Sequence, residues 1–185
     1  NPIEVYANST LITRGSAQLR TEYGRSGAED GHGIKLMESG AKAYLNSSGS
    51  VWGAEGAVYS PASGTEIVIN NGTYGRKNDN HRAVDPYGDL EINGGTIRNL
   101  WVSSKSTLHL NGGELNNGSE LNPQVPLDIE GTAYVTGGKV VPLNGQSVDL
   151  NNTGKMHILT NGSGALDLGN NVKPWTGNVQ TDNYK

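Results

Sequence analysis

The 185-residue chain contains no cysteine and no phenylalanine, and only 17% of its residues are charged. Without cysteine it can form neither a disulfide framework nor a thiolate metal site. Its net charge of −4 provides no general attraction to nucleic acids or anionic membranes, so we expect no nucleic-acid partner. No apolar run approaches the roughly 18 residues that span a bilayer, and residues 1–5 do not resemble a signal peptide. We therefore expect no membrane insertion by this segment, which reads as trimmed from a longer protein.

Apolar residues are also scarce, at 34% of the chain. Low hydrophobicity together with high net charge is typical of disorder, but here 14 basic residues nearly balance 18 acidic ones. The composition therefore predicts a folded chain with a thin core. Glycine is abundant, with 27 residues, which favours an architecture with many tight turns.

One short phrase recurs along most of the chain: apolar, polar, apolar, Asn, small residue, Gly, any residue, apolar. Clear copies begin at Ile67, Leu90 and Leu108. A copy at Ala133 replaces Asn by Thr, and a copy at Ala43 carries one extra residue. Weaker copies begin at Ile12, Val148 and Ala165. About eight repeats are expected in all.

The spacing of the repeat identifies its type. Equivalent apolar positions recur after roughly two dozen residues, with one shorter interval between the third and fourth, and they are Leu45, Ile69, Ile92, Leu110 and Val135. A propeller blade requires roughly 40 residues or more, so this spacing indicates a solenoid coil. Every segment between corners is too short for a helix, which argues against leucine-rich repeats.

Each coil divides into three short apolar segments with period-two alternation. One coil is expected to place strands at 100–103, 107–110 and 114–116, separated by polar corners. Three such strands per turn predict an all-β chain folded as a parallel β-helix of about seven or eight coils, each of roughly 18–25 residues.

The corner after the second strand carries the Asn and Gly residues of the repeat. Glycine supplies the positive φ that a tight corner requires. Stacked coils would superimpose the corner asparagines, so that Asn46, Asn70, Asn93 and Asn111 form an amide ladder continued by Thr136. The interior of such a coil is narrow, and we expect Val, Ile, Leu and Ala to fill it.

The chain is expected to be one β-helix domain over 1–185. Residues 1–31 would form a first coil or cap, 32–172 the regular coils, and 173–185 a tail or cap. Open solenoid ends expose unpaired strand edges. Either the ends are capped by residues 3–18 and 173–177, or the chain is a slice of a longer solenoid.

The phrases at 91–97 and 106–113, and Gly31-His32-Gly33-Ile34-Lys35-Leu36, resemble right-handed β-helix repeats of bacterial surface proteins. These families include autotransporter passenger domains and the pectate-lyase-like binding regions of cell-wall-anchored adhesins. The resemblance covers roughly residues 30–170. It implies a right-handed coil and an extracellular or cell-surface location. It does not select a function, because the same coil carries adhesins, lyases, glycosidases and tailspikes.

The catalytic motifs of the enzymes with this coil are missing. Of the polygalacturonase motifs only Gly31-His32-Gly33 is present, and the Arg-x-Pro-x-x-Arg pattern of pectate lyases is absent, since Arg82-Ala83-Val84-Asp85-Pro86 shares only its composition. Asp79, Asp85 and Asp89 lie close enough in sequence to hold Ca²⁺, but solvated loop carboxylates are the favoured interpretation. Four dispersed histidines lack zinc-ligand spacing. No enzyme activity, metal or cofactor is predicted.

Strand alternation predicts which side chains face outward. One sheet would expose Lys35, Tyr59, Trp101 and Asp128, and the adjoining sheet Tyr44, Val68, Glu91, His109 and Tyr134. The candidate ligand-binding residues are the aromatic members of these rows, Tyr59, Trp101, Tyr44, His109 and Tyr134. Aromatic rings beside charged and amide groups suit a carbohydrate or a protein partner.

The sequence therefore predicts a non-catalytic β-helix segment of a bacterial surface protein that binds a glycan or a host or cell-surface protein through its lateral faces. One alternative is a structural spacer or a subunit that associates end to end, because open solenoid ends template further pairing. The other is a polysaccharide lyase or hydrolase.

Overall fold

A computed structural model describes residues 3–21, 31–76, 82–116, 126–141, 148–150 and 153–158, together with two short strands at 175–176 and 179–180. Over these ranges the chain consists of strands and their connecting turns. None of the described residues belongs to a helix of the length and apolarity that membrane crossing requires.

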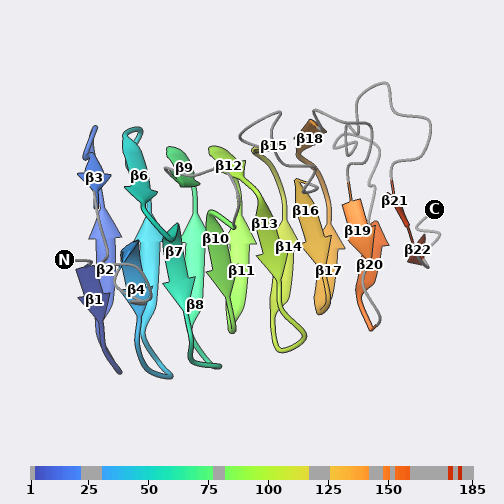
Figure 1. The fold of residues 1–185 in the computed structure, drawn as a ribbon, viewed down its shortest axis with the longest axis horizontal. Coiled ribbons are helices and arrows are strands. Elements are labelled where there is room, and N and C mark those ends of the chain that lie inside the picture. Colours follow the sequence, from blue (N-terminus) through green and yellow to red (C-terminus); the bar gives the residue numbers. More distant parts are fainter. Residues whose placement is uncertain are drawn as a thin grey trace.

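The first sheet, sheet A, contains eight parallel strands in chain order (Figure 1). They are β1 (Ile3–Val5), β4 (His32–Leu36), β7 (Gly56–Ser60), β10 (Val84–Pro86), β13 (Leu100–Val102), β16 (Leu127–Ile129), β19 (Val148–Leu150) and β21 (Trp175–Thr176).

Sheet B also contains eight parallel strands in chain order. They are β2 (Thr10–Thr13), β5 (Lys42–Leu45), β8 (Glu66–Ile69), β11 (Asp89–Ile92), β14 (Thr107–Leu110), β17 (Thr132–Val135), β20 (Lys155–Ile158) and β22 (Val179–Gln180).

Sheet C contains six described strands. They are β3 (Leu19–Arg20), β6 (Ser50–Gly53), β9 (Thr73–Arg76), β12 (Thr96–Arg98), β15 (Glu114–Asn116) and β18 (Lys139–Val141). The chain passes from sheet A to B to C and then returns to A one coil further on, so each strand pairs with its counterpart in the next coil (Figure 1). This arrangement is a parallel β-helix, which confirms the predicted fold class.

The strand boundaries match the expected coil closely. Strands predicted at 100–103, 107–110 and 114–116 are observed as β13, β14 and β15. The register aligns each repeat with the next: Ile92 pairs with Ile69 on one side and with Leu110 on the other. The unequal spacing of the repeats along the sequence is thus absorbed in the connections, while the strands remain in step.

One weak copy of the repeat lies in a different sheet from the one predicted. The segment beginning at Val148 is expected to precede an Asn corner like those of sheet B, but β19 pairs with β16 in sheet A. The sheet B strand of that coil is β20, which pairs with β17. Alternation of apolar and polar residues is common to strands of both sheets, so the pattern alone does not identify the sheet. The copy beginning at Ala165 lies outside the described residues.

The expected end segments are only partly described. Residues 3–20 supply β1, β2 and β3, which form a first coil paired with the second. At the other end, β21 pairs with β19 and β22 with β20. The remaining residues of 173–185 lie outside the described ranges.

The core is a column of aliphatic side chains inside the coil. In the middle of sheet B, Ile67, Leu90 and Leu108 lie in register and are at most 1% exposed. In sheet C, Ile97 and Leu115 do the same from the third wall. Each fully buried side chain of this size contributes about 1.5–3 kcal/mol to folding. The thin core predicted from composition is therefore distributed along the whole stack.

Tyr74 departs from the prediction that only small aliphatic residues fill the interior. It is 1% exposed and lies between Val51 and Ile97 in sheet C. Its hydroxyl donates a hydrogen bond to the Asn71 carbonyl at 2.8 Å, and burial raises the pKa of this phenol. A Cβ on Gly72 would lie 3.2 Å from the hydroxyl, so the neighbouring glycine makes room for the ring's polar end.

The corner between sheets B and C depends on glycine for two separate reasons. Gly95 has a φ of +86°, a conformation that residues with a Cβ rarely adopt. Gly94, the residue before it, has no positive φ, but its Cβ would lie 2.5 Å from the Asn70 carbonyl oxygen of the preceding coil. The first glycine of the pair allows close stacking, and the second allows the turn.

The corner asparagines form a continuous chain of amide hydrogen bonds along the stack. Nδ2 of each residue donates to Oδ1 of the residue one coil earlier, at 2.6 Å from Asn70 to Asn46, 2.8 Å from Asn93 to Asn70 and 2.9 Å from Asn111 to Asn93. Thr136 Oγ1 donates to Asn111 Oδ1 at 2.7 Å and continues the row. The structure therefore places the four asparagines and Thr136 in one ladder on the exposed corner.

Replacing Gly95 by Ala is expected to destabilise the fold more than replacing Gly15 by Ala. Both residues have positive φ, of +86° and +67°, but a Cβ at position 95 would lie 2.8 Å from the Gly72 carbonyl oxygen, whereas one at position 15 meets no atom within 4 Å. The strain of the left-handed conformation alone is about 1–2 kcal/mol. Urea unfolding should therefore show the larger loss for Gly95→Ala. Equal losses would mean that stacking distance does not restrict this corner.

Candidate functional site

The outward side chains of sheet A mix charged and aromatic groups along the stack. The register aligns Glu4 with Lys35, Lys35 with Tyr59, and Tyr59 with Asp85. Further along, Trp101 aligns with Asp128, and Asp128 with Asp149. Acidic, basic and aromatic side chains thus share one face of the solenoid, and this mixture is the starting point for the site.

At the centre of this face, Arg82 is stacked on Trp101. The guanidinium carbon lies 3.7 Å from the indole ring centroid, and Nη2 lies 3.5 Å from Asp128 Oδ2. Tyr87 contacts the same indole edge-on, with ring centroids 5.8 Å apart and planes at 80°. We call these four residues and Asp85 the Arg82–Trp101 cluster. A cation over an indole contributes about 0.5–2 kcal/mol, so the contact holds the guanidinium in place.

The local chain explains how the cluster assembles. Arg82 lies just before the β10 segment and Tyr87 immediately follows it, so both ends of this short strand provide side chains that reach the indole on β13. Pro86 has no N–H to donate, and the register between β10 and β13 consists of the single pair Val84 and Leu100. The cluster therefore lies where the ladder of sheet A is interrupted.

Two buried polar atoms of the cluster have no hydrogen-bond partner, namely Asp85 Oδ1 and Trp101 Nε1. Asp85 and Trp101 directly follow Val84 and Leu100, the single registered pair between β10 and β13. One atom accepts and the other donates. Unpaired buried groups cost about 1–3 kcal/mol each and are uncommon in native proteins, so a pair of them on one face calls for an explanation.

A third buried atom without a partner, Asn99 Oδ1, belongs to the corner between β12 and β13. Asn99 has a φ of +54°, and its backbone carbonyl accepts a hydrogen bond from the Ala83 amide at 2.8 Å. Asparagine tolerates the left-handed conformation better than most residues. The backbone geometry accounts for the presence of Asn99, which we therefore assign to the turn.

The surroundings of Asp85 change its acidity. Burial raises the pKa of this carboxyl from its ordinary value of 3.8 to about 6, with nearby Arg82 lowering it and Glu130 raising it. The folded state therefore favours the protonated form relative to the unfolded state. A carboxyl that titrates near pH 6 can exchange a proton under mildly acidic conditions.

The guanidinium of Arg82 retains most of its hydrogen-bonding capacity. An arginine side chain has five N–H donors, and among the described residues only Asp128 accepts from it. The side chain is 36% exposed, so part of it is open to solvent. A donor group fixed by stacking, beside an unpaired carboxylate oxygen and an unpaired N–H, is an arrangement suited to a polar ligand.

Trp101 was predicted to be exposed, and this prediction is wrong. It does face outward, but only 8% of its surface is exposed, because Arg82 and Tyr87 cover the indole.

Lys35 and Val68 were also expected on the exposed faces and are instead 3% and 8% exposed. Val68 lies between Tyr44 and Glu91 on the outer face of sheet B, and these larger neighbours flank it. Alternation determines the direction of a side chain but not what lies over it.

Tyr59 is half-buried on the outer face of β7. Its ring stacks on His32 from β4, with centroids 4.6 Å apart and planes at 21°. His32 belongs to Gly31-His32-Gly33, the only polygalacturonase motif found in the sequence. In the structure it stacks on Tyr59, and the coil of Tyr59 is adjacent to the coil of Asp85. The register joins Tyr59 directly to Asp85, so Tyr59 borders the Arg82–Trp101 cluster.

The aromatic residues predicted on sheet B form a second, separate group. Tyr134 lies between His109 and His157, with ring centroids 5.3 and 5.0 Å apart and planes at 21° and 17°. Rings stacked in this way present their edges outward and cover each other's faces. A sugar binds aromatic residues through the ring face, so this column is a poor platform for carbohydrate stacking.

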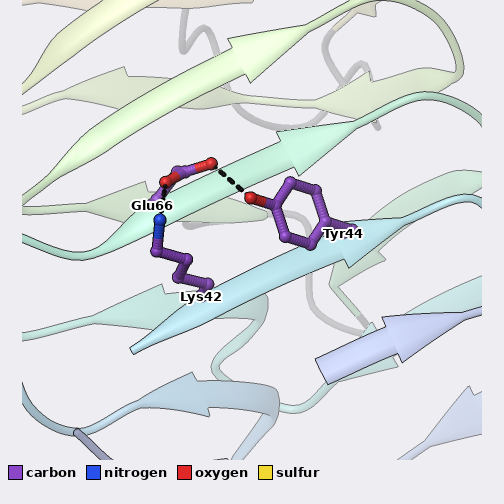
Figure 2. Close-up of polar contacts among 3 residues, drawn as sticks. All are labelled: Lys42, Tyr44 and Glu66. Atoms are coloured by element: carbon purple, nitrogen blue, oxygen red, sulfur yellow. Dashed lines mark hydrogen bonds and ion pairs between the residues drawn. The ribbon is translucent and has the colours of Figure 1, made fainter. Parts of the chain in front are cut away.

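Tyr44 is held in place by a neighbouring coil. Its hydroxyl donates to Glu66 Oε1 at 2.7 Å, and Lys42 Nζ lies 2.7 Å from Glu66 Oε2 (Figure 2). The hydrogen bond from Lys42 lowers the pKa of Glu66, and the hydrogen bond to Glu66 raises the pKa values of Lys42 and Tyr44. Tyr44 therefore serves as a cross-coil contact between β5 and β8, apart from the cluster on sheet A.

The three aspartates considered for Ca²⁺ are not brought together where they are described. Asp85 lies on β10 of sheet A and Asp89 on β11 of sheet B, and Asp79 lies outside the described residues. Within the described ranges, no group of three His, Cys, Asp or Glu side chains has a metal-binding arrangement.

Sequence reasoning missed the roles of Arg82, Asp85 and Tyr87. They lie close together in the sequence, around a strand that contains Pro86. A proline inside an otherwise regular repeat indicates an interruption of the ladder, and this was the available signal. The partner indole belongs to β13 of the next coil, and only the register reveals that the two segments meet.

Comparison of the chain with protein-family models, curated proteins and solved structures found no match.

Replacing Asp85 by Asn should change how stability depends on pH. The raised pKa means that the stabilising protonated form is present at low pH and is lost as pH rises from about 4 to about 6. The rise from 3.8 to about 6 corresponds to roughly 3 kcal/mol at most. The unsubstituted protein should therefore lose stability as pH rises through this range, and Asp85→Asn should not. The unfolding free energy of Asp85→Asn minus that of the unsubstituted protein should increase accordingly.

Urea unfolding at pH 4, 5, 6 and 7 measures this difference. The same substitution at Asp89, an exposed residue on β11, is the matched control. A difference that stays constant with pH for Asp85→Asn would show that burial does not raise the pKa of this carboxyl.

Proposed function

We propose that this chain is a non-catalytic binding segment of an extracellular surface protein and that it recognises glycans through the outer face of sheet A. The observation that carries the proposal is the Arg82–Trp101 cluster, in which a stacked guanidinium with unused donors lies beside the unpaired Asp85 Oδ1 and Trp101 Nε1. Sugar hydroxyl groups accept hydrogen bonds, so they can bond to the partly exposed guanidinium of Arg82. The resemblance of the repeats to bacterial surface proteins supports the location.

The fold gives this function a mechanical basis. Arg82, Asp85 and Tyr87 come from one coil and Trp101 and Asp128 from the next two, and the paired strands fix them relative to one another. A rigid site loses little conformational freedom when a ligand binds, which improves affinity without additional contacts. A long solenoid also extends the site away from the cell surface, which suits adhesion.

The experiment uses two arginine–tryptophan pairs on different faces. Arg82 lies over Trp101 on sheet A, and Arg98 lies 4.8 Å from the centroid of Trp52 on sheet C. Arg82→Gln should lower the affinity for a glycan selected on an array by tenfold or more, because the fixed donors are lost. Arg98→Gln removes an equivalent stacking contact and should leave the affinity unchanged.

Isothermal titration calorimetry with the selected glycan measures both effects. Equal losses of affinity in the two variants, or no loss in either, would assign the binding site to another face. If no glycan binds on the array and a host-surface protein does, the partner is a protein and the glycan proposal fails.

A second candidate function is hydrolysis of a polysaccharide, and one observation favours it. Glycosidases use one protonated carboxyl and one carboxylate, and the pKa of Asp85 is raised to about 6 while Asp128 is ion-paired with Arg82. In that case Asp85 would donate a proton to the leaving group and Asp128 would activate water.

Release of reducing or unsaturated sugar ends from polysaccharides, measured with and without Ca²⁺, separates the two functions. Under the binding proposal we expect no release. Release of reducing ends without unsaturation that disappears in Asp85→Asn and persists in Asp89→Asn would replace the binding proposal with hydrolysis, whereas unsaturated ends would indicate a lyase.

A further inference from the structure

Three Asn-Gly dipeptides lie in the described corners between sheets B and C, and they begin at Asn71, Asn93 and Asn111. In such a dipeptide the glycine nitrogen can attack the asparagine Cγ, because glycine has no Cβ to obstruct the approach. The product is a five-membered succinimide ring, and ammonia leaves. All three asparagines are exposed, so access of water to the side chain does not distinguish them. Their hydrogen bonds do.

Asn71 lies outside the amide ladder, and its side chain folds back on its own peptide. Its Oδ1 accepts a hydrogen bond from the Gly72 nitrogen at 2.8 Å. A C=O bond is about 1.23 Å long, so Cγ of Asn71 lies within about 4 Å of that nitrogen. Among the described residues nothing accepts a hydrogen bond from Nδ2 of Asn71, the atom that would leave as ammonia. The two reacting atoms are therefore close together, and the leaving group is not held.

The other two asparagines are held by the ladder. Nδ2 of Asn93 donates to the preceding asparagine of the ladder at 2.8 Å and to Glu91 Oε1 at 2.9 Å. Nδ2 of Asn111 donates to Asn93 Oδ1 at 2.9 Å. The nitrogen of Gly112, which would attack Asn111, donates to the Ile92 carbonyl at 3.1 Å. Each of these dipeptides must break hydrogen bonds before it reacts.

Two effects act on the Asn71 dipeptide in opposite directions. Gly72 is buried, which slows the removal of its proton by base. The contact between Gly72 and the Asn71 side chain keeps the nucleophile beside the carbon that it attacks. Groups held together within one molecule reach effective concentrations of about 10⁵–10⁸ M when they are well oriented, so we expect proximity to be the larger effect.

We propose that Asn71 is a site of spontaneous deamidation and that the amide ladder protects Asn93 and Asn111 from the same reaction. Base removes the proton of the Gly72 nitrogen, which forms a bond to Asn71 Cγ. The Cγ–Nδ2 bond breaks, and Nδ2 takes a proton from water and leaves as ammonia. Water then opens the succinimide, at Cγ to give aspartate or at the main-chain carbonyl carbon to give isoaspartate. The net reaction consumes one water molecule and releases one ammonia, and it does not depend on the proposed binding function.

The isoaspartate product fits this corner poorly. It lengthens the main chain by one carbon, and the Asn71 carbonyl that accepts from the Tyr74 hydroxyl at 2.8 Å becomes part of a free carboxylate. The next coil packs directly on this peptide, since a Cβ on Gly95 would lie 3.1 Å from the Asn71 carbonyl carbon. Deamidation is therefore expected to weaken the stacking of this coil on the next one.

Peptide mapping by mass spectrometry follows the three sites in the full chain during storage in mildly alkaline buffer. One sample keeps its fold, and the other is unfolded in guanidinium chloride, where the three dipeptides no longer differ in their hydrogen bonds. In the folded sample Asn71 should be converted at least tenfold faster than Asn93 or Asn111, whereas the three rates should be similar in the unfolded sample. Equal rates in the folded sample, or faster conversion of either ladder residue, would overturn the proposal.

Asn71→Gln is the control for the effect on stability, because glutamine would have to close a six-membered ring, which is much slower. Each protein is unfolded in guanidinium chloride before and after storage. The midpoint should fall more in the unsubstituted protein than in Asn71→Gln. Three further Asn-Gly dipeptides, at 117–118, 144–145 and 161–162, lie outside the described residues, so the difference between the two proteins is what reports on Asn71. Equal falls in both proteins, with Asn71 converted, would overturn the expected weakening of the stack.

Discussion

The close stacking of the corners between sheets B and C is the constraint on which the structure depends. Gly95 takes a positive φ, and a Cβ on Gly94 would overlap the Asn70 carbonyl oxygen one coil earlier. Because these corners stack without side-chain atoms between them, successive strands come within hydrogen-bonding distance and the corner asparagines align. The ladder from Asn46 to Thr136 is thus a consequence of the glycine corners as well as a support for them.

Regular stacking at one corner permits irregularity elsewhere. Coil length varies along the chain, yet Ile69, Ile92 and Leu110 remain in register. The variation falls on the connections, where the chain can change without shifting the core. The Arg82–Trp101 cluster uses this freedom, since it forms where Pro86 interrupts pairing between β10 and β13 and where two turn residues reach the indole of the next coil.

The two aromatic faces differ in what they offer a ligand. On sheet B the rings of His109, Tyr134 and His157 stack on one another, so their faces are already in contact. On sheet A the indole is covered by a guanidinium, and the unpaired atoms are polar. Recognition on sheet A would therefore rely on directed hydrogen bonds more than on ring stacking, and a hydroxyl-bearing ligand fits that chemistry best.

The sequence by itself determined the three-stranded coil, the corner glycines and the asparagine row, because these depend on local alternation and on spacing that every coil repeats. It did not determine the sheet of Val148–Leu150, the aromatic Tyr74 inside the coil or the cover over Trp101. Alternation gives the direction of a side chain, whereas its exposure depends on neighbours from other coils. Only the tertiary structure brought Arg82 and Asp85 beside an indole one coil away, because that contact is set by register between strands and not by any pattern within one of them.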